Sequence, residues 1–370
     1  GGGAPVYYRD TKRPEYLDKL NSENLNELPE IKDLKKAFLE VFSSPNIVSK
    51  RWVYEQYDSM VRTNTVVGPG SDAAVIRIKD TNKAIAACTD CNGRYVYLNP
   101  REGAKIAVAE AARNVVCSGA IPLAITNCLN FGNPYKPEMY WTFKEAVEGM
   151  GDACRFFETP VTGGNVSFYN ESPDAAVYPT PVIGMLGLIE DVSQTLTSNF
   201  KQSGDLIYVL GEDYEEIGGS EFLKIIHNKV SGNPPKINLQ TEKELFELMN
   251  ELSSEKLLQS AHDISEGGII CALAECCIGN QEKFVGANVK IESKSRMDFA
   301  LFSESQSRII VSIKKESKAE FENLAGKSKV SFKFLGETAD DFMNINDLHF
   351  DLNELGYIYF NTISKRMNEA

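Results

Sequence analysis

The segment Pro100-Arg-Glu-Gly-Ala-Lys-Ile-Ala-Val-Ala-Glu-Ala-Ala-Arg-Asn-Val115 carries apolar residues at the spacing of a helix. Ala104, Ala107, Ala111 and Val115 share one face at a period of 3.6 residues. Their side chains are small, so this face allows close packing against a sheet. The segment therefore predicts a buried helix that covers a sheet.

Strands and helices alternate on both sides of this helix. Ala84–Thr89 and Leu123–Thr126 are typical of short buried strands, and residues 143–157 repeat apolar positions at helical spacing. Val177–Ile189 is a long apolar strand with two prolines, and Gly204–Gly211 begins a second series of strands and helices. The pattern predicts an α/β protein, more narrowly of the α+β kind.

The length of the chain favours two domains. Its 370 residues exceed the ~250–300 residues at which single cores stop growing. We expect a lead-in over residues 1–50, a first domain over 51–192 and a second over 193–370. The lead-in holds an amphipathic segment, Ile31–Phe42. A Ser44-Pro45 pair typical of a helix start predicts a short helix from there through Tyr54 and Met60.

Charge and composition exclude several classes of function. The formal net charge of −13 argues against nucleic acid or an anionic membrane as the main partner. No signal peptide and no apolar run near ~18 residues is present, so neither export nor a membrane span is indicated. The chain begins at Gly1 without a Met, which suggests the interior of a longer protein or a processed product.

The eight cysteines favour reduced thiols in a cytoplasmic protein. Cys88 and Cys91 form a C-x-x-C pair, but no second pair follows at the spacing of a zinc site, and the chain has only three histidines. A metal or redox role for the pair stays open as the weaker alternative.

Thr159-Pro-Val-Thr-Gly-Gly-Asn-Val-Ser167 is the first candidate for chemistry. We interpret it as a short strand that ends in a Gly-Gly turn, where the backbone can approach a phosphate. The Asn165 amide oxygen can ligate Mg²⁺, and the Ser167 hydroxyl can hydrogen-bond an anionic substrate. An ordinary turn explains the same residues.

Other polar motifs have two interpretations each. Asn127–Pro134 follows a strand, where side chains commonly face a cleft, or it is a plain strand-to-helix turn. Asp72 either serves a metal–nucleotide site or caps a turn, and the cap is favoured. His262 either does acid/base work or merely precedes a helix capped by Asp263 or Ser265, and the capping interpretation is favoured.

Ser303-Glu-Ser-Gln306 either binds a ligand or is a polar turn between strands, and taken alone the turn is favoured. No Ser/His/Asp or Cys/His nucleophile arrangement can be argued, and no Walker or G-x-G-x-x-G fingerprint stands where it would be needed.

Taken together, these segments resemble the small form of phosphoribosylformylglycinamidine synthase, the PurL family of purine biosynthesis. The resemblance rests on motifs spread over nearly the whole chain: Ser44–Asp58, Arg62–Thr65, Pro69–Val75, Ala109–Ala120, Cys128–Pro134, Gly163–Ser167, Pro179–Gly184, Gly218–Glu221, His262–Gly268 and Ser303–Gln306. The chain looks like the C-terminal half of that enzyme. The resemblance implies a PurM-like half, in which a sheet-plus-helices domain precedes a PurM C-terminal-like α+β domain.

The resemblance also implies an activity and a set of partners. The family is an ATP-dependent C–N ligase that converts formylglycinamide ribonucleotide to the amidine, with ammonia from the PurQ glutaminase and PurS as a bridging protein. At matching positions it implies Asn127 and Gly164 for ATP, Asn165 for Mg²⁺ and Ser167 for substrate. The N-terminal half of the same enzyme becomes the first partner, and self-pairing is the alternative.

This sequence departs from the family at two places. Asn127 stands where the family usually has Asp. The family's Ser-His-Asn-His stretch corresponds to Thr89-Asp-Cys-Asn-Gly-Arg94, which contains no imidazole. We therefore expect no catalytic residue in this half and no activity from it alone. A catalytically silent scaffold half, and a kinase-like member of the wider superfamily, are the competing interpretations.

Overall fold

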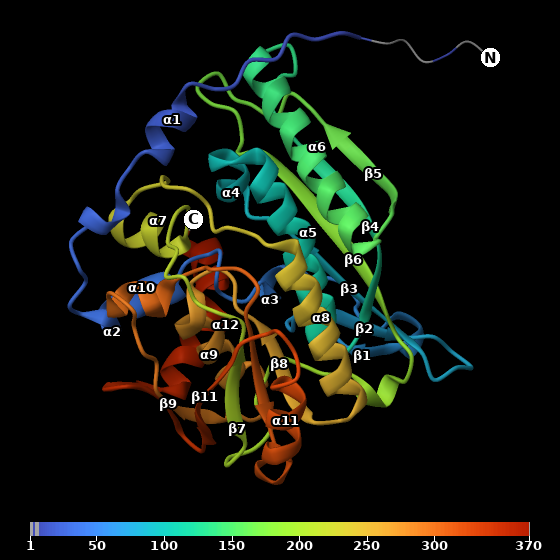
Figure 1. Cartoon of the computed structure of the whole chain (residues 1–370), viewed down its shortest axis with the longest axis vertical. Helices are drawn as coiled ribbons and strands as arrows, with labels where there is room; N and C mark the ends of the chain where they lie inside the picture. Colours follow the sequence, from blue (N-terminus) through green and yellow to red (C-terminus); the bar gives the residue numbers. More distant parts are fainter. Residues whose placement is uncertain (1–2, 4–6, 370) are drawn as a thin grey trace.

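The computed structural model describes residues 3 and 7–369. Residues 65–189 form a six-stranded sheet in the order β1-β2-β3-β6-β4-β5 (Figure 1). Its strands are Thr65–Val67 (β1), Ala74–Arg77 (β2), Ala84–Asp90 (β3), Ile121–Asn130 (β4), Val161–Ser167 (β5) and Thr180–Ile189 (β6). All neighbours are antiparallel except β4 and β5, which run parallel. This arrangement makes β5 an edge strand.

Two long helices, α5 (Pro100–Cys117) and α6 (Pro137–Phe157), lie along one face of this sheet (Figure 1). The small residues of α5 pack onto inward-facing strand residues such as Ala86 and Met185, all of them buried. The helix predicted from its alanine-rich face is therefore confirmed. Asn99 begins it, because its side chain accepts a hydrogen bond from the Glu102 N–H.

Residues 206–351 form a seven-stranded sheet in the order β13-β12-β9-β11-β7-β10-β8. The strands are Leu206–Leu210 (β7), Leu258–Asp263 (β8), Gly286–Val289 (β9), Ile309–Ile313 (β10), Phe332–Ala339 (β11), Phe342–Ile345 (β12) and Leu348–Asp351 (β13). The side chains of β7 point alternately into two hydrophobic cores, one on each face of this sheet. Helices α8 (Leu239–Ser254) and α11 (Lys318–Ala325) cover the first core. Helices α9 (Gly268–Ile278) and α10 (Met297–Phe302) cover the second. The α+β class is thus confirmed.

The remaining helices are α1 (Tyr16–Asn21), α2 (Leu34–Phe42), α3 (Arg51–Tyr54), α4 (Gly93–Leu98), α7 (Glu221–His227) and α12 (Leu352–Glu369). The lead-in is not an independent segment, because Phe38 and Phe42 of α2 lie in the core of the second sheet. No helix in the described part of the chain is both long and apolar enough to cross a membrane.

The helix predicted to start at Ser44-Pro45 is wrong. The only α-helix found there is the single turn α3, and Ser44 does not cap it. Ser44 is buried instead, and its hydroxyl donates to the carboxylate of Glu221 177 residues away. Its oxygen also accepts the backbone N–H of Asn46 at 3.3 Å, so Ser44 closes a local turn, but no helix begins at that turn.

Candidate functional site

Strands β4 and β5 place the four predicted site residues next to one another. In the parallel register, Asn127 lies opposite Gly164, Cys128 opposite Asn165, and Asn130 opposite Ser167. Residues separated by almost forty positions in the sequence therefore meet at one edge of the sheet.

The predicted Gly-Gly turn is wrong, because β5 continues through both glycines to Ser167. Neither glycine has a positive φ, so no turn conformation requires them. Gly164 is required for a steric reason, because a Cβ at this position would lie 2.1 Å from Asn127 Oδ1. Gly163 has open space where its Cβ would be. The Asn127 side chain thus lies over Gly164, and only glycine leaves it room.

The four residues present their side chains on both faces of the sheet. The Asn165 amide nitrogen lies 3.9 Å from Cys128 Sγ, so these two side chains share the face away from the helices. Asn127, one position earlier, points to the opposite face, as strand alternation requires. Ser167 Oγ donates to Asn170 Oδ1 at 3.2 Å, which fixes the hydroxyl beside the end of β5.

This site is an open sheet edge with side chains on both of its faces. Gly164 and Asn165 are exposed, and Asn127 and Ser167 are half-buried. Asn127 also lies inside β4, which runs to Asn130, and not in a turn after a strand. Amide oxygens and a hydroxyl at an exposed sheet edge can contact a ligand, but they do not enclose it.

The donor set fits Mg²⁺ only in part. Mg²⁺ in proteins is usually held by one or two carboxylates together with substrate phosphates. Asn165 offers a single neutral oxygen, and no cluster of three or more His, Cys, Asp or Glu side chains of metal-binding kind occurs among the described residues. A cation here would need carboxylates from elsewhere.

A second polar arrangement surrounds His262 on β8. Its Nδ1 lies 3.0 Å from both carboxylate oxygens of Asp72, and its Nε2 lies 3.1 Å from Glu275 Oε2. Burial works against the charged ring, but the two carboxylates outweigh it and hold the pKa of His262 well above its usual value. An imidazolium with both nitrogens occupied is a poor general base.

The favoured interpretation of Asp72 as a turn cap is wrong. Besides His262, its carboxylate accepts a hydrogen bond from the backbone N–H of Asp263 at 2.9 Å. Asp72 therefore joins the first domain to the second. A cavity of about 340 Å³ opens beside this pair, with Lys50, Asn114 and Tyr359 in its walls.

The capping interpretation of Asp263 is also wrong. Helix α9 begins after Gly267 without a side-chain cap, and Asp263 instead accepts a hydrogen bond from Arg113 Nε at 2.6 Å. Arg113 is fully buried and also contacts Glu242 and Gln306. Burial lowers the pKa of Arg113, but Asp263 and Glu242 outweigh it, so the guanidinium stays charged.

Ser303–Gln306 is not a polar turn between strands. It connects α10 to β10 and is buried throughout. Glu304 Oε1 accepts the backbone N–H groups of Glu221 and Gly267 at 2.8 Å each, and Tyr95 donates its hydroxyl to the same carboxylate. Burial raises the pKa of Glu304 to about 7, although Arg94 opposes the shift. The segment is a buried loop of the second domain that contacts the first domain through Tyr95.

The C-x-x-C pair carries free thiols, and burial raises the pKa of both Cys88 and Cys91 well above the usual value. This favours inert thiols over reactive ones. Sequence reasoning missed Arg113 as the centre of a buried ion network. Arg113 lies on the face opposite the Ala104–Val115 stripe. That face also carries Ile106, Ala109 and Val116, so an arginine among apolar side chains was the available signal.

Two family models match the chain in succession. The AIR synthase related protein N-terminal domain matches residues 70–189, and the AIR synthase related protein C-terminal domain matches residues 202–345. The PurL subunit of phosphoribosylformylglycinamidine synthase from Moorella thermoacetica is 50% identical over 332 residues, which are 90% of this chain and 45% of that protein. The chain thus spans about half the length of the curated relatives it matches.

Solved structures agree at the level of the fold. T. maritima PurL complexed with FGAR has a TM-score of 0.72 at 19% identity. The alignment covers 92% of this chain and 56% of the T. maritima chain. T. maritima PurL complexed with ATP has a TM-score of 0.64 at 20% identity, and the alignment covers 86% of this chain and 52% of the T. maritima chain. With its two successive domain matches and its 50% identical relatives, this chain belongs to the AIR synthase related proteins and, among them, to the PurL family.

Proposed function

We propose that this chain is the C-terminal half of an ATP-dependent phosphoribosylformylglycinamidine synthase and supplies one wall of its active site. In this role Asn127 and Gly164 contact ATP, Asn165 ligates Mg²⁺, and Ser167 contacts formylglycinamide ribonucleotide. The observation that carries the proposal is the register of β4 and β5, which gathers these four residues on an open sheet edge.

Binding of an N-terminal half is supported by the face of the first sheet that α5 and α6 leave uncovered. Ile76, Ile85, Ile121 and Leu186 are each 38–50% exposed there. Ile76 and Ile85 lie opposite one another on β2 and β3, so they form one continuous surface. Apolar patches of this kind mark interaction surfaces. The N-terminal half would cover it, and PurQ and PurS would join that assembly.

In this proposal, the residues of this chain bind and orient ATP and the ribonucleotide, and none of them transfers a proton. Ser167, held by Asn170, presents its hydroxyl to substrate, and Asn127, held against Gly164, presents its amide to nucleotide. Mg²⁺, when bound, would neutralise phosphate charge, with carboxylates coming from the other half. The acid/base groups belong to that half too, since His262 is held between two carboxylates.

The test is reconstitution. The isolated chain should show no amidine formation with ATP, ammonium and formylglycinamide ribonucleotide, and addition of a PurL N-terminal half should restore it. In the reconstituted enzyme, Ser167→Ala should raise the KM for the ribonucleotide, whereas the matched change Ser203→Ala, at an exposed serine before β7, should not. Turnover by the isolated chain would overturn the half-site proposal.

A scaffold half that binds no nucleotide is the second candidate, favoured by the exposure of Gly164 and Asn165. It predicts normal assembly with the N-terminal half but unchanged kinetics for Asn127→Ala, Asn165→Ala and Ser167→Ala. Light scattering on the isolated chain separates a monomer from a self-paired dimer that uses the same apolar face.

A further inference from the structure

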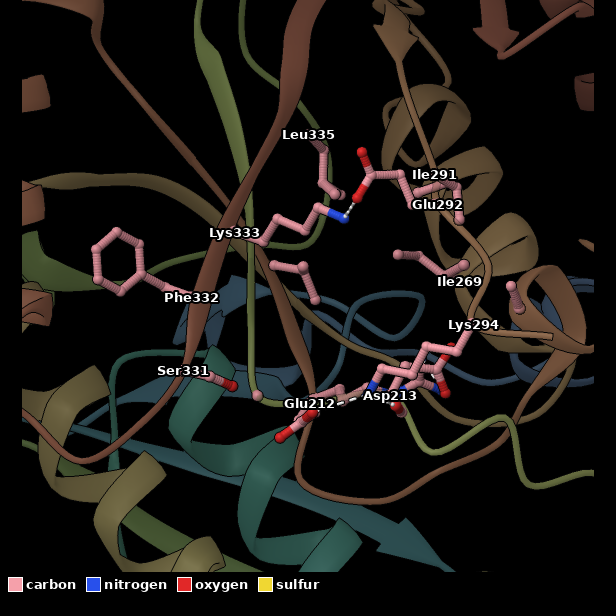
Figure 2. Close-up of a pocket in the computed structure, with 14 residues that line it drawn as sticks. Glu212, Asp213, Ile269, Ile291, Glu292, Lys294, Ser331, Phe332, Lys333 and Leu335 are labelled. Atoms are coloured by element: carbon pink, nitrogen blue, oxygen red, sulfur yellow. Dashed lines mark hydrogen bonds and ion pairs between the residues drawn. The ribbon is translucent and has the colours of Figure 1, made fainter.

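A cavity of about 290 Å³ enters the core of the second domain, away from the proposed active-site wall (Figure 2). Most of its inner surface is apolar and is formed by Val209, Ile269, Ile291, Ala300 and Leu335, and the buried Arg308 also lines it. The five apolar residues belong to the core between the second sheet and helices α9 and α10. Figure 2 shows Ile269, Ile291 and Leu335 around this space, whereas Phe332 points away from it.

The cavity exists because two strands separate. Strand β9 pairs with β11 only from Gly336 to Ala339, and the last hydrogen bond between them runs from Lys290 N to Leu335 O at 2.9 Å. The register of β11 shifts between Phe334 and Gly336, and its first residues pair with β7 alone. The chain after β9 therefore leaves the sheet, and the core beneath it stays open.

The charges around the opening are balanced in pairs. Lys333 Nζ contacts Glu292 at 2.5 Å and Lys294 Nζ contacts Glu212 at 2.8 Å, so both pairs bridge the segment after β9 to a neighbouring strand or loop. A third pair joins the buried Arg308 to Asp213 at 3.4 Å. Each charge already has its counter-charge.

We propose that this cavity is a binding site for a small uncharged ring compound. Its volume equals that of about ten water molecules at ~30 Å³ each, which accommodates a one- or two-ring body. Five aliphatic side chains favour apolar surface over water. A charged ligand would have to displace one member of an ion pair, whereas a neutral ring leaves all three pairs intact.

Three probes with the same aromatic body test the charge preference. Indole is neutral, indole-3-acetate is an anion and tryptamine is a cation. We expect saturation-transfer NMR on the full chain to detect indole at millimolar concentration, with the two charged probes at least several-fold weaker. Equal or stronger binding of either charged probe would overturn the proposed ligand class, and no transfer to any probe would overturn the site.

Variants locate the binding. Ser331 lines the opening and its side chain is exposed, so Ser331→Phe should block the cavity without disturbing the core. Ser203→Phe places the same ring at an exposed serine that does not line the cavity and is the matched control. Indole transfer should disappear in the first variant and persist in the second. Equal transfer in both variants would refute the location.

A second blocking variant protects the test from a folding failure. Ile291→Trp fills the cavity from the segment after β9 and should also abolish indole transfer. Near-identical circular dichroism of the three variants shows that loss of binding is not loss of structure. These outcomes are independent of ATP or ribonucleotide binding, so they stand apart from the proposed synthase role.

Discussion

Replacement of Gly164 by Ala probes the most specific contact in the proposed active-site wall. The added Cβ would lie 2.1 Å from Asn127 Oδ1 and 2.9 Å from the Asn127 carbonyl oxygen. The amide can rotate away, because it is the end of a side chain, but the carbonyl oxygen belongs to the β4–β5 ladder. Overpacking of this kind costs about 1–3 kcal/mol.

Gly163→Ala is the matched control, one residue earlier on the same strand. A Cβ at Gly163 meets no atom within 4 Å, and this glycine also has no positive φ. Its replacement should leave the free energy of unfolding within about 0.5 kcal/mol of the wild type, or raise it slightly, because alanine restricts the unfolded chain. Both variants are Gly-to-Ala changes at neighbouring positions of β5, and they differ in the atoms that the added Cβ would meet.

Urea unfolding followed by tryptophan fluorescence measures the difference. Trp141 lies in α6 over the first sheet, so its signal reports on this domain. A double-mutant cycle with Asn127→Ala should recover part of the loss, since one of the two close contacts disappears. If Gly164→Ala is as stable as Gly163→Ala, Asn127 does not lie over Gly164 and the geometry of the nucleotide wall is wrong.

Three further predictions follow from the buried polar groups and the wall. Arg113→Met should destabilise the chain by about 3–5 kcal/mol in urea unfolding, because it leaves buried carboxylates unpaired, whereas Arg101→Met, at a half-exposed pair on the same helix, should cost less than about 1 kcal/mol. Since the pKa of Glu304 is raised from 4.5 to about 7, its contribution to stability is full below pH 4.5 and is lost as pH rises through 7. Between pH 5 and 8, the free energy of unfolding of the wild type should therefore fall by about 1–3 kcal/mol relative to that of Glu304→Gln. Parallel pH profiles of the two proteins would contradict this. ATP with Mg²⁺ at about 100 times Kd should stabilise the reconstituted enzyme by ~2.7 kcal/mol, and Asn165→Ala should remove most of that gain at the same ligand concentration.

Sequence patterns predicted the elements of the fold well, because each depends on side chains within one segment. The apolar stripe of α5 and the long apolar strand β6 both appear where periodicity placed them. The Gly163-Gly164 pair misled for a physical reason. Glycine occurs in turns where the backbone needs a positive φ. It also occurs in strands where an atom of a neighbouring strand leaves no room for a Cβ. The two cases can be distinguished only when the neighbouring strand is known.

The polar residues were harder to interpret than the apolar ones for a related reason. Asp72, Asp263 and Ser44 are all residue types that cap helices and turns, so a local interpretation assigns them local N–H groups. In the structure each has a partner at least 150 residues away, His262, Arg113 and Glu221 respectively. All three contacts join the lead-in or the first domain to the second domain.

The same contacts explain why the chain holds together as one body and still leaves its proposed site open. At the interface between the two domains, Arg113, His262 and Glu304 each have their charged or hydrogen-bonding partners within this chain. The wall formed by Asn127, Gly164, Asn165 and Ser167 lies outside this interface, on the free edge of the first sheet. A ligand that needs enclosure must therefore find its second wall on another chain segment, which is why reconstitution with an N-terminal half, and not the isolated chain, is the decisive experiment.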